Sequence, residues 1–323
     1  MRIVVTGGFG FIGSSFCELA VKNGHELIVL DKMTYAADFE NISESTKSKL
    51  HFVNLDISNG RMLSQALRDI NSIDWIVNFA AESHVDRSIK DGTPFVNSNV
   101  LGVVNLLEFI KQNSAIKMLQ VSTDEVFGSI DEGSWDEDFP LNPRSAYSSS
   151  KASAELFCNA YRSTHSLEIT ITRCANNFGP RQSAEKLIPT IIQSALTGIS
   201  IPVYGDGSNR REWIYVEDHA ASILTIIESE KRISPKYNLG GSEKSNIEIV
   251  KSVLGIMGKS ENLISFVPDR LGHDYRYSVD DRRYKNEYGN YVSFDFELQL
   301  ESTVTWYLSN QEWLARSKSK VNS

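Results

Sequence analysis

A short apolar strand that runs into a glycine-rich turn at the start of the chain places the strongest limit on the fold. Ile3-Val4-Val5 leads into Thr6-Gly7-Gly8-Phe9-Gly10-Phe11-Ile12-Gly13. The glycines fit both Gly-x-x-Gly-x-x-Gly and Gly-x-Gly-x-x-Gly. Glycine permits a tight turn and lets backbone N–H groups approach a pyrophosphate, and the following helix presents its positive end to the same phosphates. The strand before the loop and the helix after it are the context that a dinucleotide-binding motif requires.

The first half of the chain continues as apolar runs that alternate with amphipathic stretches. Strands are expected at residues 3–5, 26–30, 51–55, 75–79, 117–121 and 168–172, and helical stretches at 13–23, 60–70 and 97–113. Strands separated by helices pair through right-handed crossovers and not through hairpins. The pattern therefore predicts an α/β fold of the Rossmann type, a doubly wound parallel sheet covered on both faces.

The alternation of strand and helix patterns ends after about Phe178, where glycine and proline become frequent. Apolar periodicity returns at residues 216–228, 246–257 and 300–307. We expect a smaller, interleaved α/β substrate domain, made of residues 178–211 plus 244–323. The dinucleotide-binding domain would be residues 1–177 plus 212–243. The polar, basic stretch 315–323 is expected to be a frayed tail.

Composition excludes several classes of protein. The 323 residues carry 33 Lys plus Arg against 41 Asp plus Glu, a net charge of -8 that argues against nucleic acid as a partner. No apolar run is long enough to span a membrane, and no signal peptide is expected because a buried-strand pattern follows Met1-Arg2 directly. Cys17, Cys158 and Cys174 are scattered, which indicates a reducing, cytoplasmic location. The histidines show no metal-ligand spacing, so no metal is expected.

Two carboxylates follow the second and third strands. Asp31 lies eighteen residues beyond Gly13, where a carboxylate can bind an adenosine ribose and repel a 2′-phosphate, which favours NAD over NADP. Lys32, next to it, weakens that preference, and the alternative for Asp31 is a helix or turn cap. Asp56, followed by Ile57, either reaches the adenine or caps a turn.

Tyr147-Ser148-Ser149-Ser150-Lys151 places a phenol and an ammonium on one face of a helix. A nearby ammonium favours the phenolate, and lowering the phenol pKa by about three units takes roughly 4 kcal/mol. Thr123 directly follows a strand, where its hydroxyl can bind the oxygen that Tyr147 deprotonates. Two ordinary helix residues are the alternative, but with the glycine loop upstream the set describes hydride removal from a secondary alcohol.

Asp124 and Glu125 come next, at the end of a strand where ligands bind in doubly wound sheets. An isolated pair of this kind would be a solvated acidic turn. Beside the Tyr147/Lys151 centre, one carboxylate can donate a proton while the other removes one, if their environments separate the two pKa values. A simple dehydrogenase has no use for such a pair, whereas an elimination does.

The chain resembles the extended short-chain dehydrogenase/reductases and, within them, the nucleotide-sugar 4,6-dehydratases. The shared segments run nearly end to end: the glycine loop, residues 30–36, 80–88, 122–128, 173–180, 185–189, 203–207, 215–219 and 269–274. The Thr123-Asp124-Glu125 triplet is the specific part, because related epimerases and decarboxylases have the glycine loop and the Tyr/Lys pair without the acidic pair.

This resemblance implies a three-stage reaction. Tyr147, with Thr123 holding the oxygen, takes the proton of the C4 hydroxyl as the C4 hydride leaves. Glu125 removes the C5 proton, Asp124 protonates the departing C6 hydroxyl, and the hydride returns to C6. The implied substrate is an NDP-hexose, dTDP-glucose first and UDP-glucose next. The implied NAD site consists of Gly7, Gly10, Phe11, Ile12, Gly13, Asp31, Lys32, Thr34, Asp56, Ile57, Ala80, Ala81, Tyr147 and Lys151.

The resemblance also implies substrate contacts and a homodimer. The substrate contacts are Ser83, Asn177, Glu185, Lys186, Arg211, Asn238, Arg270 and His273, whereas His84 and His219 are expected to be structural. The dimer would form a four-helix interface from residues 97–113 and 149–164, with Leu106, Phe109, Leu156 and Phe157 in the seam. The alternative is that these four residues cover the sheet.

Some residues depart from the family pattern. Arg181-Gln182-Ser183-Ala184 replaces an aromatic, proline-containing stretch beside the sugar pocket, which leaves the nucleotide and the C2 substituent open. Glu212 stands where the family has Asp, and no departure is expected to touch the acid, base or hydride machinery. The alternative functions are a nucleotide-sugar 4-epimerase or oxidoreductase, a UDP-N-acetylhexosamine 4,6-dehydratase, and a non-catalytic NAD-binding sensor.

Overall fold

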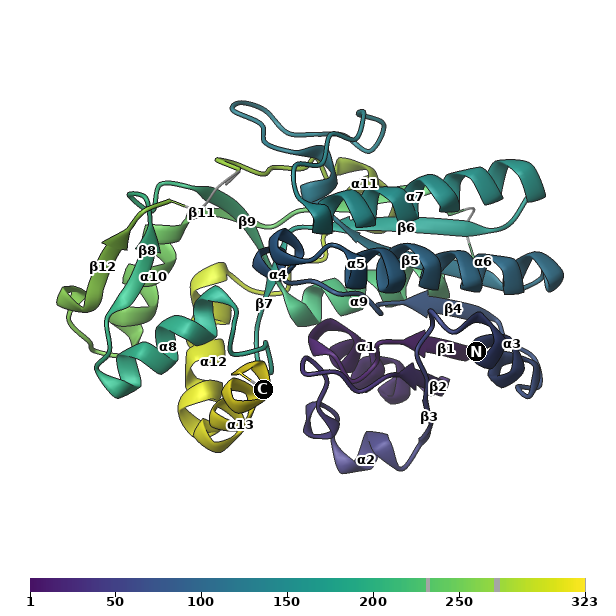
Figure 1. Cartoon of the computed structure of the whole chain (residues 1–323), viewed down its shortest axis with the longest axis horizontal. Coiled ribbons are helices and arrows are strands. Elements are labelled where there is room, and N and C mark those ends of the chain that lie inside the picture. The colour runs from purple at the N-terminus through teal and green to yellow at the C-terminus, as the bar shows by residue number, and fades with distance from the viewer. Residues whose placement is uncertain (231–232, 270–273, 323) are drawn as a thin grey trace.

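A seven-stranded parallel sheet forms the centre of the molecule, as predicted (Figure 1). The computed structural model of the chain describes residues 1–230, 233–269 and 274–322. The strand order is β10-β6-β5-β4-β1-β2-β3. The strands are β1 (Arg2–Thr6), β2 (Glu26–Asp31), β3 (Leu50–Asn54), β4 (Trp75–Asn78), β5 (Lys117–Thr123), β6 (Ile169–Cys174) and β10 (Lys236–Leu239). The order reverses between β1 and β4, so a crevice opens at the carboxyl ends of these strands.

Helices cover both faces of this sheet. One apolar core lies under α1 (Phe11–Lys22), α9 (Val216–Glu228) and α11 (Arg282–Tyr288). The other lies under α3 (Gly60–Arg68), α6 (Gly102–Gln112) and α7 (Ala146–His165). The π-helical turn η2 (Val96–Leu101) leads into α6, and α7 begins with a capping box in which Ser145 and Ser148 bind each other's backbone. That cap fixes the start of the helix that carries Tyr147 and Lys151.

A smaller lobe lies beside the carboxyl ends of the strands (Figure 1). Its helices are α8 (Leu187–Thr197), α10 (Asn246–Ile256), α12 (Phe296–Ser309) and α13 (Gln311–Asn322). Two small sheets complete it: β11 (Ser242–Ser245), β9 (Arg210–Tyr215) and β7 (Asn176–Phe178), and the pair β12 (Ile264–Val267) and β8 (Ile201–Tyr204). The short helices are η1 (Phe39–Asn41), α2 (Glu44–Lys47), α4 (Val85–Lys90), α5 (Thr93–Phe95), η3 (Asp124–Phe127) and η4 (Glu261–Leu263).

The two lobes share strand β9. Ile214 packs into the core of the large sheet, whereas Trp213 and Tyr215 face the core of the small lobe, because neighbouring residues of a strand point to opposite sides. Tyr284 of α11 also packs in the large-sheet core, although its segment was assigned to the smaller domain. We propose two lobes with the predicted boundaries, modified so that α11 belongs to the dinucleotide-binding lobe.

The prediction of a frayed tail at residues 315–323 is wrong, because α13 is helical through Asn322. Trp313 of this helix is buried, and its indole N–H donates to Asn41 at 3.2 Å. Lys320 donates to the Ala37 carbonyl and forms an ion pair with Asp38 at 2.7 Å. These contacts join the end of the chain to the loop between β2 and β3, so tertiary packing orders a segment whose sequence is polar.

The structure also corrects the prediction that Leu106 and Phe109 lie in the dimer seam. Both side chains are buried in the core between α6 and the sheet, so their surfaces are not available to a second copy. Leu156 and Phe157 of α7 are 60% and 40% exposed. Among the described residues, no helix combines the length and apolar character needed to cross a membrane.

A buried ion pair joins α7 to β6. The Arg173 guanidinium donates to both carboxylate oxygens of Glu155 at 2.6 to 3.1 Å, and both side chains are almost fully buried. We expect Glu155→Gln to lower the free energy of unfolding by about 3–5 kcal/mol, because it leaves a buried cation without its counter-charge. The matched change Glu168→Gln, in an exposed pair with Lys117, should cost at most about 1 kcal/mol. Urea unfolding measures both, and equal losses would contradict the expectation.

Candidate active site

The glycine loop adopts the close-packed turn that its sequence predicts. Gly7 has φ +69°, and a side chain there would place its Cβ 2.7 Å from the Ala80 nitrogen, while a Cβ on Gly13 would lie 2.2 Å from the Gly7 oxygen. The helix after the loop starts without a side-chain cap, and its first residues Phe11 and Ile12 line the cavity. Uncapped N–H groups at a helix start suit an anionic phosphate, so the loop fits a bound dinucleotide.

Asp31 and Asp56, the two carboxylates predicted to reach an adenosine, line one cavity. Asp31 is buried, and its carboxylate accepts from the backbone N–H groups of Phe9 at 3.0 Å and Met33 at 2.8 Å. Asp56 accepts from the Ser58 N–H at 2.9 Å, as a turn cap does, and Lys32 lies 3.6 Å from it. Both carboxylates therefore hold the loops and also line this cavity.

The predicted cofactor residues come together around two adjoining cavities. Asp31, Lys32, Thr34, Asp56, Ile57, Ala80 and Ala81 line the first, and Phe11, Ile12, Gly13, Tyr147 and Lys151 line the second, with Gly7 and Gly10 between them. The second cavity also contains Thr123, Asp124, Glu125, Ser83, Asn177, Glu185 and Lys186. One continuous site therefore has room for a dinucleotide along the strand ends and a substrate beside its reactive end.

The surroundings of Asp124 favour the neutral form of its carboxyl. Burial raises the pKa of its carboxyl well above the ordinary range, and the nearby carboxylates of Glu125 and Glu212 raise it further. Its Oδ1 accepts from the Thr123 hydroxyl at 3.2 Å, whereas its buried Oδ2 has no hydrogen-bond partner within the described part of the chain. A neutral carboxyl in a cavity can give a proton to a leaving oxygen.

Tyr147 and Lys151 line the same cavity, and burial changes the pKa of both. Burial raises the pKa of the Tyr147 phenol well above its ordinary value, followed by the charge of Glu125, while a hydrogen bond with Thr123 lowers it. Burial lowers the pKa of Lys151 to about 8, and its ammonium donates to the Val121 carbonyl at 2.6 Å. The expected lowering of the Tyr147 pKa by the Lys151 ammonium stays a prediction for the enzyme with its cofactor bound.

The expected hexose contacts Asn177, Glu185 and Lys186 line this cavity too. Asn177 donates to the Ala175 carbonyl at 3.0 Å, and its oxygen is 2.8 Å from the buried imidazole of His219. Lys186 donates to the Ser83 carbonyl at 3.1 Å. Glu185 lies 3.4 Å from His84, and burial raises the pKa of its carboxyl. His84 and His219 thus hold substrate-side residues, in keeping with their expected structural role.

Arg211 and Asn238 are not brought to the cavity. The Arg211 guanidinium stacks on Tyr277 and donates to the Asp274 carbonyl at 2.8 Å, so it holds the backbone beside the site. Asn238 is fully buried in β10 and donates to the Trp135 carbonyl at 2.9 Å. In this structure both polar groups satisfy buried carbonyls, and their direct contact with substrate stays a prediction. Arg270 and His273 lie outside the described residues.

Sequence reasoning missed the electrostatic role of Glu212. The carboxylate is buried, accepts from Ser278 at 2.7 Å, and has its pKa raised by burial to about 7. Its charge is one cause of the raised pKa of the Asp124 carboxyl. No spacing rule signals this charge effect, because β9 and the segment after β5 come near each other only in the folded chain.

The segment 181–184, which differs from the family pattern, also contributes residues to the site. Gln182 Oε1 and Ser183 Oγ are buried, line the cavity, and have no hydrogen-bond partner among the residues that the structure describes. Tyr307 holds this segment from behind by donating to the Gln182 carbonyl at 2.7 Å. Two polar atoms are therefore left for hydrogen bonds to a ligand.

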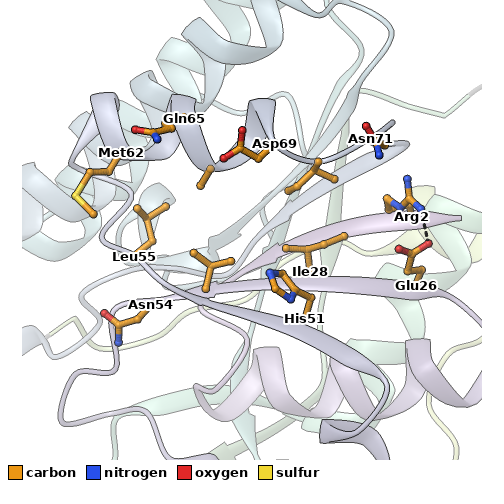
Figure 2. Close-up of a pocket in the computed structure, with 13 residues that line it drawn as sticks. Arg2, Glu26, Ile28, His51, Asn54, Leu55, Met62, Gln65, Asp69 and Asn71 are labelled. Atoms are coloured by element: carbon orange, nitrogen blue, oxygen red, sulfur yellow. Dashed lines mark ion pairs between the residues drawn. The ribbon is translucent and has the colours of Figure 1, made fainter.

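A separate hollow lies between α3 and strands β2 and β3 (Figure 2). Ile28 and Leu55 form part of its apolar wall, and the ion pair of Arg2 with Glu26 at 2.8 Å borders it. Its lining includes neither the glycine loop nor the acid/base residues. The chemistry therefore belongs to the cavity at the strand ends.

The fold and the site define a dinucleotide-binding α/β protein with an acid/base pair beside a Tyr/Lys centre. The family model described as "GDP-mannose 4,6 dehydratase" matches residues 4–302, and the chain belongs to this family of nucleotide-sugar 4,6-dehydratases in the short-chain dehydrogenase/reductase class. It is 47% identical to the low-salt glycan biosynthesis protein Agl12 of Haloferax volcanii, over 97% of this chain and 100% of that protein. It is 40% identical to a dTDP-glucose 4,6-dehydratase of Actinoplanes sp., over 97% of this chain and 99% of that one.

The fold agrees with a solved structure as well. DesIV, a dTDP-glucose 4,6-dehydratase from Streptomyces venezuelae solved with NAD bound, is 41% identical. It superposes with a TM-score of 0.92 over 97% of this chain and 98% of that one. The predicted Rossmann-type fold and the predicted family are both confirmed.

Proposed function

We propose that the protein is an NAD-dependent lyase that converts an NDP-hexose, with dTDP-glucose as the first candidate, into the 4-keto-6-deoxy sugar with loss of water. The observation that carries the proposal is the Thr123-Asp124-Glu125 triplet beside Tyr147 in one cavity, with Thr123 and Asp124 buried. From this set, an oxidoreductase or epimerase needs only Tyr147 and Thr123. An elimination needs the two carboxyl groups as well.

The residues divide the chemistry among them. Tyr147 takes the proton of the C4 hydroxyl, and Thr123 holds the same oxygen. NAD, when bound, supplies the acceptor that takes the C4 hydride and returns it at C6. The ketone at C4 acidifies the C5 hydrogen, so Glu125 can remove it while Asp124 protonates the departing C6 hydroxyl.

The test is product analysis of the purified protein with dTDP-, UDP-, GDP- and CDP-hexoses. We expect a product lighter by one water, with a ketone at C4 and a methyl group at C5, from dTDP-glucose before UDP-glucose. An unchanged mass with inverted C4 would instead support the 4-epimerase. The polar atoms of Gln182 and Ser183 make the C2 substituent worth varying, so the panel includes UDP-N-acetylglucosamine.

A homodimer built through α7 belongs to the same proposal. Leu156 and Phe157 on α7 and Val96 and Leu101 on η2 are apolar and 40% to 60% exposed, which suits a helical seam. We expect Leu156→Glu to shift the molar mass measured by light scattering from two chains to one. Ile199→Glu, at an equally exposed apolar residue of the small lobe, is the control and should leave the mass unchanged. A Leu156→Glu protein of unaltered mass would argue against this interface.

We further propose that the enzyme works in the cytoplasm. Cys17, Cys158 and Cys174 are buried free thiols. Burial raises the pKa of the Cys158 and Cys174 thiols to about 12, which keeps them in the unreactive form.

A further inference from the structure

The proposed reaction, on which this inference rests, leaves a proton imbalance within the site. Oxidation of C4 gives one proton to Tyr147, whereas expulsion of the C6 hydroxyl as water takes one from Asp124. The C5 proton moves to Glu125 and returns from it, so it cancels. At the end of each turnover Tyr147 holds one proton more, and Asp124 one fewer, than at the start.

The Thr123 side chain contacts both the residue that gains a proton, Tyr147, and the residue that loses one, Asp124. The Thr123 hydroxyl donates to Asp124 Oδ1 at 3.2 Å, and it is also the hydrogen-bonding neighbour of the Tyr147 phenol. Thr123 and Asp124 are 7% and 2% exposed, and the three side chains line the same cavity. The shortest path from the phenol to the carboxyl therefore runs through one hydroxyl.

The direction of these hydrogen bonds follows from the state at the end of a turnover, when the Tyr147 phenol is protonated and can donate while the ionised Asp124 carboxylate can only accept. A hydroxyl has one proton to donate and two lone pairs that accept. The Glu125 N–H, which can only donate, occupies one lone pair of Thr123 Oγ1 at 3.3 Å, and the hydroxyl proton points to Asp124 Oδ1. The remaining lone pair is the one that can accept from Tyr147, so the chain of donors runs from Tyr147 through Thr123 to Asp124.

We propose that Thr123 relays a proton from Tyr147 to Asp124 in every turnover and so resets the site without exchange with solvent. The Tyr147 O–H bond breaks as an O–H bond forms at Thr123 Oγ1. The original Thr123 hydroxyl proton then passes to Asp124 Oδ1. A half-turn of the carboxyl about its Cβ–Cγ bond presents the reloaded oxygen to the next substrate. The proton of the C4 hydroxyl thereby balances the proton lost with the water.

Two variants of Thr123 test the relay. Thr123→Val keeps the shape and removes the hydroxyl, whereas Thr123→Ser keeps the hydroxyl and is the matched control. With enzyme in excess, a single turnover needs no reset, so we expect Thr123→Val to lose about 10-fold there through its missing contact to the substrate oxygen. In steady state we expect a further loss of about 100-fold, typical of a lost proton transfer. Thr123→Ser should keep both rates within a few-fold.

Rescue by a small proton carrier separates a relay from a structural role. At constant pH, rising imidazole concentration should restore steady-state turnover of Thr123→Val and leave its single-turnover rate unchanged. Equal losses in the two regimes, with no response to imidazole, would overturn the relay and leave Thr123 as a contact to the substrate oxygen. The NAD content and the urea midpoint of each variant report whether it is folded.

The wild-type enzyme provides a test that does not depend on a variant. Its steady-state turnover should be independent of imidazole concentration, and a clear rise would overturn the relay because protons would then be exchanged with solvent. Failure of the proposed function looks different: wild-type enzyme would release no dehydrated product from any sugar nucleotide.

Discussion

Replacing Asp124 with asparagine should slow water loss by about 10²- to 10⁴-fold while C4 oxidation persists. The amide has nearly the same shape but cannot give a proton to the departing C6 hydroxyl. Oxidised sugar should therefore accumulate on the enzyme, visible in stopped flow as near-ultraviolet absorbance of reduced nicotinamide. Asp131→Asn, at an exposed loop carboxylate, is the matched control and should turn over like the wild type.

The pH dependence of this step follows from the environment of Asp124. Burial first, and the charges of Glu125 and Glu212 next, raise the pKa of its carboxyl well above the ordinary range. The acid form is therefore present below that raised pKa, and water loss should slow as pH rises through it. Asp124→Asn should lack this decline, and abolished C4 oxidation in the variant would contradict the assigned role.

Tyr147→Phe should suppress the first oxidation by about 10²- to 10⁴-fold, because no other side chain is assigned to take the C4 hydroxyl proton. No absorbance of reduced nicotinamide should then appear when substrate is mixed with the holoenzyme. Tyr161→Phe is the matched control, since Tyr161 lies on the same helix but binds Glu108 away from the cavity. Full turnover by Tyr147→Phe would remove this residue as the base.

The oxidation step should respond to pH in the opposite direction from water loss. Burial raises the pKa of the Tyr147 phenol, so its deprotonated form gains population as pH rises. Pre-steady-state oxidation by the wild-type enzyme should therefore speed up with pH, whereas the residual rate of Tyr147→Phe should be flat. A wild-type rate that does not change between neutral and alkaline pH would show that loss of this proton does not control the step.

Most of the dinucleotide site could be predicted from local sequence patterns. The loop from Gly7 to Gly13, Asp31 and the helix with Tyr147 and Lys151 lie where their spacing predicts, because each depends on neighbours only a few residues away. The hydrogen bonds of Arg211 and Asn238 could not be predicted, because the direction of a side chain on a strand depends on which buried carbonyls lie around it. Those carbonyls come from residues 274 and 135, far along the chain.

The parallel sheet, the phosphate loop and the types of group available for acid/base chemistry could be predicted from the residues alone, since strand periodicity, glycine turns and side-chain identity are local properties. Which groups act on one another depends on how the whole chain packs. The tertiary structure buried Asp124 beside Glu212 of a distant strand, gave Thr123 its place between the phenol and the carboxyl, and ordered the C-terminal helix against the loop after β2. Desolvation and charge interaction depend on distances through space, and those distances are set only when the whole chain packs.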